Sequence, residues 1–386
     1  MENEKAIRRH RLVYKLGRKL VVPGLLKKYS YQTDFVPQTD YPCIIMANHT
    51  TESDMTMLMR ACPEFMYFVC GEHLLRSKHA GLIVKYFDPI TEFKGAVATA
   101  TVREILRRIK AGFHVMIFPE GSRSFHGETI PLENSIGKLV KTSHAGLVTY
   151  RTQGGYFIAP RWAYTFRKGP ARGKVMHVYS PEELKEMSAA EITAIINADL
   201  YENAYQTQRE DPQEYTGERL AEGIENYLII CPECGAYDSL ESKDNAFSCS
   251  CCGKKGVYTT KGFLEGDFRF DSVYDWGKWT DVRFKEDMKG KEQEELLFHE
   301  TDLTLYKVTR DHEQITLGEG SMDVYADRME FEGQVFPFRE IPVVNMLYYG
   351  KTLLFTHDDI YYGITGEHFH ARKCNLLYDI FREDKR

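Results

Sequence analysis

The sequence predicts three folded parts: an α/β domain whose mostly parallel sheet is flanked by helices, a small cysteine-rich ribbon, and a β-rich C-terminal domain. Three observations lead to this prediction. In the first half, short apolar runs alternate with apolar residues at helical spacing. Five of the nine Cys lie within residues 231–252. Aromatic residues make up 13% of the 386 residues, and many fall in alternating apolar patterns in the last third.

The expected boundaries follow from these patterns and from the charge distribution. A basic segment over 1–34 comes first, followed by the α/β domain over 35–228, the ribbon over 229–256 and the β-rich domain over 265–386. With 43% hydrophobic and 27% charged residues, the composition is that of a globular protein rather than a disordered or fibrous one.

The basic charge is concentrated at the N-terminus. Residues 1–28 carry a net charge of +7, while the whole chain carries −6 and the remainder therefore −13. An acidic bulk argues against a nucleic-acid partner, whereas a short basic segment is attracted to an anionic membrane surface. A merely solvated basic tail is the alternative reading.

Leucines in this segment repeat with the period of a helix. Leu12, Leu16 and Leu20 are four residues apart among many Lys and Arg, which predicts a basic amphipathic helix over 6–22 that ends at Pro23. No apolar run approaches the roughly 20 residues needed to span a bilayer, and no secretory signal is recognisable. We therefore expect a cytoplasmic protein that associates peripherally with the membrane.

The α/β pattern starts with two apolar strands, 43–47 and 114–118. Between them, apolar residues over 102–109 follow helical spacing, and Gly112 stands where a helix C-cap is expected. Polar residues just past the ends of parallel strands are candidate site residues. Acidic helices over 182–230, two of them beginning at Ser-x-x-Glu sequences, are expected to close the domain.

The segment Asn48–Asp54 follows the first strand and contains His49 and Asp54. An imidazole can take a proton from a hydroxyl near neutral pH if a carboxylate fixes its tautomer. Residues five apart on one helix point about 140° apart, so the pair can meet only if His49 precedes the helix. In the alternative reading, Thr51 and Asp54 form a helix capping box and His49 is a turn residue.

A second polar segment, Phe118–Ser124, follows the second strand and contains Glu120, Gly121 and Arg123. The Arg123 guanidinium is suited to bidentate phosphate binding, and Lys94, upstream, offers a second cation. Downstream, Ile158–Pro160 ends another apolar run.

Taken in order, the Asn48–Asp54 and Phe118–Ser124 motifs resemble those of the glycerolipid acyltransferases typified by 1-acylglycerol-3-phosphate acyltransferase, over roughly residues 35–225. The resemblance implies that His49 is the general base and that Asp54 orients it. It also implies that Glu120, Gly121 and Arg123 shape the acceptor side, with Arg123 holding a phosphate. Lys94 stands where the family has a phosphate-binding Arg, and Ile158–Pro160 loosely matches the family's fourth motif.

The implied reaction is transfer of an acyl group from acyl-CoA or acyl-carrier protein to the free hydroxyl of a lysophospholipid, with lysophosphatidic acid as the first expected acceptor. It requires neither a covalent acyl-enzyme nor a catalytic metal. Cys43 and Cys62 lie outside the motifs, which argues against a cysteine nucleophile. Two alternatives stay open: a catalytically silent lipid-binding adaptor, and a hydrolase or transacylase that uses the same site.

The cysteine cluster has the spacing of a metal site. Cys231 and Cys234, and then Cys249 and Cys252, form two Cys-x2-Cys-Gly knuckles, with Cys251 left over. Four thiolates satisfy tetrahedral zinc and leave no position open for a substrate, so this pattern predicts a structural zinc site. Nucleic-acid binding by the ribbon is disfavoured because few Lys surround it.

The last third predicts strands joined by turns, with a hairpin at Glu332–Gly333 and a closing helix that carries Leu377 and Ile380 on one face. Several strands followed by a helix resemble a pleckstrin-homology or GRAM-type barrel. Such a module would contact lipid headgroups or a partner protein, or would only stabilise the chain.

Overall fold

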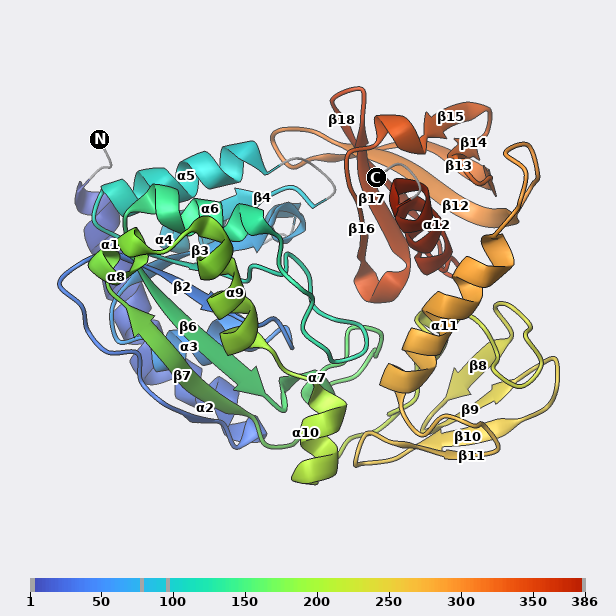
Figure 1. Ribbon diagram of the computed structural model, residues 1–386, viewed down its shortest axis with the longest axis horizontal. Coiled ribbons are helices and arrows are strands. Elements are labelled where there is room, and N and C mark those ends of the chain that lie inside the picture. Colours follow the sequence, from blue (N-terminus) through green and yellow to red (C-terminus); the bar gives the residue numbers. More distant parts are fainter. Residues whose placement is uncertain (1–3, 77–79, 95–97, 384–386) are drawn as a thin grey trace. The chain divides into compact units, whose positions relative to one another are not determined.

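Contacts within the chain divide it into two units (Figure 1). The computed structural model describes residues 4–76, 80–94 and 98–383. The first unit comprises residues 1–92, 98–160 and 166–217, and the second comprises residues 93–97, 161–165 and 218–386.

A seven-stranded sheet forms the centre of the first unit, in the order β1-β7-β6-β2-β5-β3-β4. Its strands are β1 Gln32–Thr33, β2 Cys43–Ala47, β3 Met66–Gly71, β4 Ile90–Glu92, β5 His114–Ile117, β6 Gly146–Gln153 and β7 Arg172–Tyr179. All neighbouring pairs are parallel except β6 and β7. The predicted mostly parallel α/β sheet is therefore confirmed.

Both faces of this sheet are covered, which explains why its central strands are continuous apolar runs. Ile44 and Met46 of β2 belong to one core cluster with residues of α5, α6 and α9. Ile45 and Ala47 belong to a second cluster with residues of α3. Alternate side chains of a strand point to opposite faces, so the five residues of β2 are all buried.

The helices of this unit follow several of the predicted local signals. They are α1 Glu4–Leu16, α2 Val22–Leu26, α3 Asp54–Ala61, α4 Ala80–Phe87, α5 Thr99–Lys110, α6 Asn134–Ser143, α7 Gly155–Ile158, α8 Pro181–Glu186, α9 Ala189–Leu200 and α10 Ala204–Glu210. Ser180 and Ser188 both form capping boxes, at α8 and α9. Gly112, just past α5, has a φ of +84° as expected for a C-cap.

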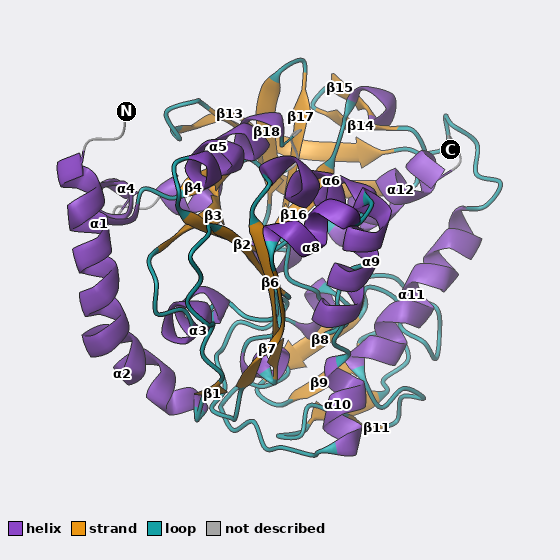
Figure 2. Cartoon of the chain, turned by 60° about the vertical axis from the view of Figure 1, so that its left-hand side comes forward, coloured by secondary structure: helices purple, strands orange, loops and turns teal. Residues whose placement is uncertain are grey.

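The N-terminal helix differs from the prediction in where it ends. Pro23 does not break it: a π-helical turn over Gly17–Val21 leads directly into α2, with Pro23 in the first turn of α2. The wider π-helical turn before it accommodates the proline, which has no N–H to donate to a carbonyl of the preceding turn. Figure 2 shows α1 and α2 following one another along one side of the unit.

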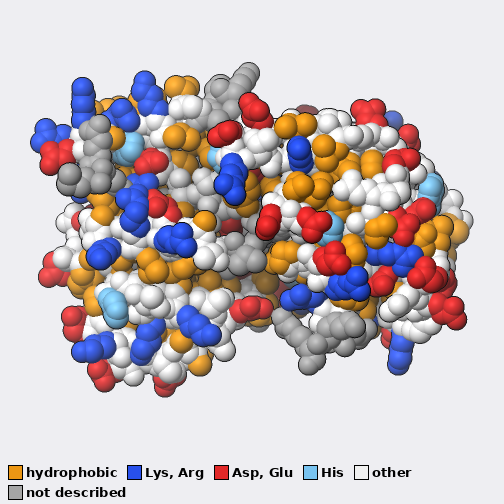
Figure 3. Space-filling view, turned by 90° about the horizontal axis from the view of Figure 1, so that it is seen from above, with side chains coloured by type: hydrophobic (Ala, Val, Ile, Leu, Met, Phe, Trp, Pro, Cys, Tyr) orange, Lys and Arg blue, Asp and Glu red, His pale blue; other side chains and the backbone are white. Residues whose placement is uncertain are grey.

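The predicted leucine stripe of this helix faces solvent. His10 and Tyr14 are the buried residues of α1, and Val22 and Leu26 those of α2. The exposed apolar residues of the segment are Leu12, Leu16, Leu20, Val21 and Leu25, with Leu20 74% exposed. Figure 3 shows Lys and Arg side chains interspersed with hydrophobic ones on one face of this unit. Among the described residues, no helix is long and apolar enough to span a bilayer.

The second unit contains two antiparallel sheets. The first has the order β11-β10-β9-β8, with β8 Leu240–Lys243, β9 Ala246–Cys249, β10 Lys255–Tyr258 and β11 Leu264–Gly266. The second has the order β15-β14-β13-β12-β18-β17-β16, with β12 Phe298–Val308, β13 Gln314–Val324, β14 Arg328–Phe331, β15 Gln334–Pro337, β16 Val344–Leu347, β17 Thr352–His357 and β18 Ile360–Thr365. The predicted β-rich character of the C-terminal part is confirmed, and the Glu332–Gly333 hairpin joins β14 to β15.

In the second unit, one helix precedes the strands of the larger sheet in the sequence and another follows them. The predicted closing helix is α12 Arg372–Glu383, and its Leu377 lies in the core of this unit. The sequence prediction missed α11, Val273–Met288. Its signals were present: Ser272 caps its N-terminus, and the buried Trp276, Thr280 and Phe284 are four residues apart.

Candidate active site

The site is built where β2 and β5 end side by side. Because these strands are parallel neighbours, the turns that follow them emerge at the same edge of the sheet. Asn48 holds the first turn in place: its side chain donates to the carbonyl of Thr152 at 2.9 Å and accepts from the Thr152 amide at 2.7 Å. This buried clamp to β6 was not recognised in the sequence.

His49 lies in the turn before α3, and Asp54 is the first residue of that helix. The two side chains meet, with 2.9 Å between His49 Nδ1 and Asp54 Oδ2. The imidazole also stacks on the Phe118 ring at a centroid distance of 4.1 Å, and its side chain keeps 21% exposure. The condition that His49 must precede the helix is therefore met.

Asp54 is completely buried and accepts several hydrogen bonds besides that of His49. The amides of Thr50 and Thr51 donate to Oδ2 at 2.5 and 2.9 Å, and the Thr50 hydroxyl donates to Oδ1 at 2.9 Å. The carboxylate thus fixes the turn as well as the imidazole. Only half of the alternative capping box forms: the Asp54 carboxylate accepts the Thr51 amide, but the Asp54 amide donates to the Thr51 carbonyl at 3.2 Å rather than to the Thr51 hydroxyl.

Glu120 ties the two motifs together. Its carboxyl accepts the His49 amide at 2.7 Å and the Ile130 amide at 2.8 Å. Burial raises the pKa of Glu120 to about 8, although these two hydrogen bonds oppose the shift. Gly121 forms the turn at this point with a φ of +68°, and its amide donates to the Phe118 carbonyl at 3.1 Å.

Arg123 reaches back to the first motif. Its guanidinium pairs with Glu52 at 2.9 Å and donates to the Ala159 carbonyl at 3.3 Å. The apolar run that includes Ile158 ends in the short helix α7 rather than in a strand. Lys94 lies in the turn after β4 and belongs to the second unit rather than to the unit of His49, so its role stays a prediction.

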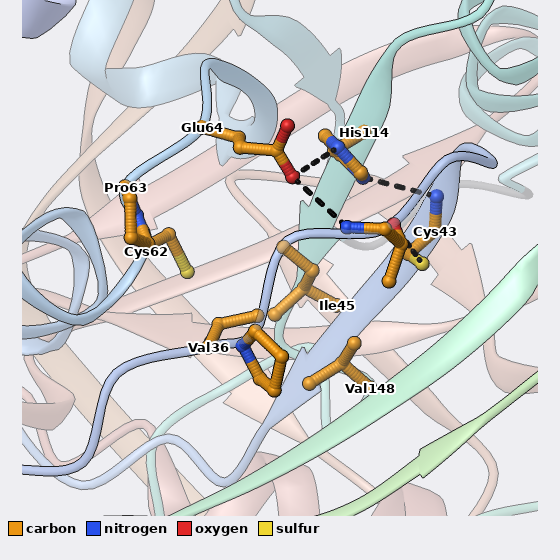
Figure 4. A pocket seen from close by; sticks show the side chains of 10 residues that line it. Val36, Cys43, Ile45, Cys62, Pro63, Glu64, His114 and Val148 are labelled. Atoms are coloured by element: carbon orange, nitrogen blue, oxygen red, sulfur yellow. Dashed lines mark hydrogen bonds and ion pairs between the residues drawn. The ribbon is translucent and has the colours of Figure 1, made fainter.

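Cys43 and Cys62 of the first unit are poor nucleophiles. Figure 4 shows Cys43 and Cys62 lining a small pocket beside Glu64 and His114. Cys43 and His114 begin β2 and β5, so this pocket is at the opposite ends of the strands from His49. Burial raises the pKa of the Cys43 thiol to about 11 and that of Cys62 to about 12, so both are protonated at neutral pH.

The four predicted metal ligands come together in the second unit. The sulfur atoms of Cys231, Cys234, Cys249 and Cys252 lie within 4.8 Å of one another, and Cys251 is left out. In each knuckle the glycine that follows the second cysteine, Gly235 or Gly253, has a φ near +75° and donates its amide to the carbonyl of the first cysteine at 2.9 Å. Glycine permits this left-handed turn without strain. The chemistry of four soft thiolate donors fits a metal such as zinc.

A carboxylate-held imidazole at the ends of adjacent parallel strands has the chemistry that general-base catalysis on a hydroxyl group requires. Comparison with known proteins agrees with the motif order. Residues 29–160 match the family model described as Acyltransferase. This part of the chain is an acyltransferase domain, and the protein is an acyltransferase. The chain is also similar to the crystal structure of the 1-acyl-sn-glycerophosphate (LPA) acyltransferase, PlsC, from Thermotoga maritima, with 18% identity, a TM-score of 0.44, and coverage of 54% of this chain and 84% of that one.

Proposed function

We propose that the protein transfers an acyl group from acyl-CoA or acyl-carrier protein to the free hydroxyl of a lysophospholipid, with lysophosphatidic acid as the leading acceptor. The observation that carries this proposal is the 2.9 Å contact between His49 Nδ1 and the buried carboxylate of Asp54. With Nδ1 directed at Asp54, the ring uses Nε2 to accept a proton.

In the proposed reaction, Nε2 of His49 takes the proton of the acceptor hydroxyl as its oxygen attacks the thioester carbonyl carbon. Asp54 stabilises the imidazolium that forms. The tetrahedral intermediate then collapses, the carbon–sulfur bond breaks, and the imidazolium returns the proton to the leaving thiolate. Ester and free thiol result, with no covalent acyl-enzyme and no metal in any step.

The acceptor side is assigned to the second motif. Glu120 and Gly121 shape the turn against His49, and Arg123 holds the acceptor phosphate in this proposal. Its guanidinium already lies beside the first motif through Glu52, so a bound phosphate would compete with that carboxylate for it. Lys94 is proposed as a second phosphate ligand on the basis of the motif order.

We further propose that the segment 1–34 binds the protein to anionic membranes. The exposed leucines of α1 and the π-helical turn supply an apolar stripe, and the flanking Lys and Arg supply charge.

For the second unit, we propose a structural Zn²⁺ on the four cysteines of the 229–256 ribbon. The order of seven strands and a helix supports a domain of the pleckstrin-homology or GRAM type over 265–386.

The chain offers a matched control for the catalytic test. His177 on β7 pairs with Asp199 at 2.9 Å, in the same unit but away from the ends of β2 and β5. We would measure transfer of labelled acyl groups from acyl-CoA and acyl-carrier protein to a panel of lysophospholipids. His49→Ala is expected to lower the rate about 10²- to 10⁴-fold, and His177→Ala to leave it unchanged.

Product analysis separates the alternatives in the same experiment. Release of free fatty acid that depends on His49, with no new ester, would replace the transferase by a hydrolase. Lipid binding without turnover of any thioester by folded wild-type protein would favour the adaptor. Equal rates for His49→Ala and wild type would refute the proposed general base.

A further inference from the structure

The turn that holds His49 is supported by a path of hydrogen bonds that begins outside both sequence motifs. Glu120 accepts the His49 amide through Oε1 at 2.7 Å and the Ile130 amide through Oε2 at 2.8 Å. Because one rigid carboxyl group makes both contacts, the position of the Ile130 amide helps to set the position of the His49 backbone. The residues that fix the segment 127–130 therefore bear on the imidazole.

The segment 127–130 is fixed by the turn between α9 and α10, residues 201–203. The Thr129 amide donates to the Glu202 carbonyl at 2.9 Å. The Thr129 hydroxyl accepts the Glu202 amide at 2.9 Å and donates toward the carbonyls of Leu200 and Glu202 at 3.1 and 3.2 Å. Thr129 thus joins the two segments through both its backbone and its side chain.

The Glu202 side chain ties this turn to the central sheet. It is buried, with 4% exposure, and its carboxylate accepts the side-chain amide of Gln153 at 2.9 Å and the hydroxyl of Thr207 at 2.7 Å. Gln153 is the last residue of β6. The same end of β6 also holds the Asn48 side chain, so it supports the first motif by two routes.

The second route reaches the site at a small cavity. This cavity has a volume of about 10 Å³, close to that of a single water molecule, and the residues that line it include His49, Glu120, Thr129 and Glu202. Thr129 and Glu202 therefore lie close to the imidazole, although neither belongs to the Asn48–Asp54 or the Phe118–Ser124 motif.

Resting on the general-base role proposed for His49, we propose that Thr129 and Glu202 are positioning residues for acyl transfer. Acting through the Ile130 amide and Glu120, they hold the His49 ring where Nε2 reaches the acceptor hydroxyl. Proton transfer requires a narrow range of distances and angles, so a small displacement of this turn lowers kcat. Neither residue contacts a substrate in the proposed reaction, so KM should change little.

Thr129→Val tests this role because it replaces the hydroxyl by a methyl group. We expect kcat to fall about tenfold and KM to stay within about twofold of the wild type. Thr129→Ser keeps the hydroxyl and should keep kcat within about twofold. Both would be measured by steady-state acyl transfer well below the unfolding temperature of each variant.

Thr193→Val is the matched control. The Thr193 hydroxyl is also buried and doubly bonded, donating to the Ala189 carbonyl at 2.9 Å and accepting the Gly137 amide at 3.2 Å, where α9 contacts α6. Its loss should lower the unfolding temperature as Thr129→Val does. It should leave kcat unchanged, because it lies outside the path to Glu120.

A double-mutant cycle with Glu120→Gln separates positioning from general stabilisation. The amide side chain has one acceptor oxygen, so it loses the contact to the His49 amide or to the Ile130 amide. The path is then already interrupted, and adding Thr129→Val should change kcat by less than about twofold. A residue that only stabilises the fold would lower kcat by the same factor in both backgrounds.

Gln153→Ala carries the same test if Thr129→Val does not fold, because it releases the Glu202 carboxylate while leaving the segment 127–130 intact. It should lower kcat about threefold. An unchanged kcat in these variants, or factors that multiply in the Glu120→Gln cycle, would overturn the positioning role and leave the general base standing. Full activity of His49→Ala would overturn both.

Discussion

Replacing Asp54 by Asn tests the electrostatic core of the proposed mechanism while it preserves the shape of the site. Oδ2 of Asp54 accepts from His49 Nδ1 and from the amides of Thr50 and Thr51. An amide oxygen in the same position can accept all three hydrogen bonds, and the Thr50 hydroxyl can rotate to accept from the new NH₂ group. What disappears is the negative charge 2.9 Å from the imidazole.

That charge matters most when the imidazolium forms. Leaving one member of a buried ion pair without its partner costs about 3–5 kcal/mol, and the Asp54 side chain is completely buried. If this cost falls on the transition state, kcat decreases about 10²- to 10⁴-fold. KM should change little, because Asp54 is not expected to contact either substrate.

The assay is steady-state acyl transfer with the preferred acceptor, together with thermal unfolding of each variant. Asp199→Asn is the control, since Asp199 makes the same 2.9 Å contact to His177 outside the site. Its kcat should stay within about twofold of the wild type, because the His177–Asp199 pair lies outside the site and its imidazole is mostly exposed to solvent. An Asp54→Asn protein that is folded and keeps more than about a third of the wild-type kcat would refute the assigned role.

Three further predictions follow from other parts of the molecule. Leu16→Gln with Leu20→Gln should weaken binding to phosphatidylglycerol-containing vesicles about tenfold or more, because apolar area is lost from the stripe. Leu317→Gln, at an exposed position of β13, is the control. Unchanged vesicle binding in the double variant would exclude membrane binding through the leucine stripe. Cys249→Ser should abolish zinc binding and lower the unfolding temperature, whereas Cys251→Ser should keep one zinc per chain by metal analysis; zinc retained in Cys249→Ser would contradict the ligand set. The pKa of Glu120 is raised from its ordinary value of 4.5 to about 8. Between these two pH values the native protein therefore binds more protons than the unfolded chain, so the free energy of unfolding falls as pH rises. This group contributes at most about 1.4 kcal/mol per pH unit to that fall. Urea denaturation at several pH values should show that Glu120→Gln removes this slope and that Glu182→Gln, at an exposed position, does not; an unchanged slope in Glu120→Gln would show that the raised pKa is wrong.

Much of the candidate site was predictable because its signals are local. The strand 43–47, the turn that holds His49, and the helix that begins at Asp54 follow one another within twelve residues. Adjacent parallel strands bring their C-terminal ends together, so the meeting of this turn with Glu120 follows from the α/β pattern. The four-cysteine cluster was predictable for the same reason, since each knuckle brings two ligands together within four consecutive residues.

Other features depended on packing between distant residues. Nothing in the sequence indicates that Arg123 pairs with Glu52, or that Phe118 stacks on the imidazole, because each contact joins residues about 70 positions apart. The extent of burial around Glu120, and with it the raised pKa, likewise appears only once the chain is folded.

The sequence by itself determined the class of enzyme, the His49 and Asp54 pair and the cysteine set, since these rest on residue type and on short spacings. The tertiary structure decided which side of the N-terminal helix is buried, because a stripe of leucines and a stripe containing His10 and Tyr14 compete for the same core. It also decided that Phe93 belongs with the second unit, where its ring packs against Tyr361. Burial is a property of the whole fold, and local periodicity cannot say which of two apolar faces will be covered.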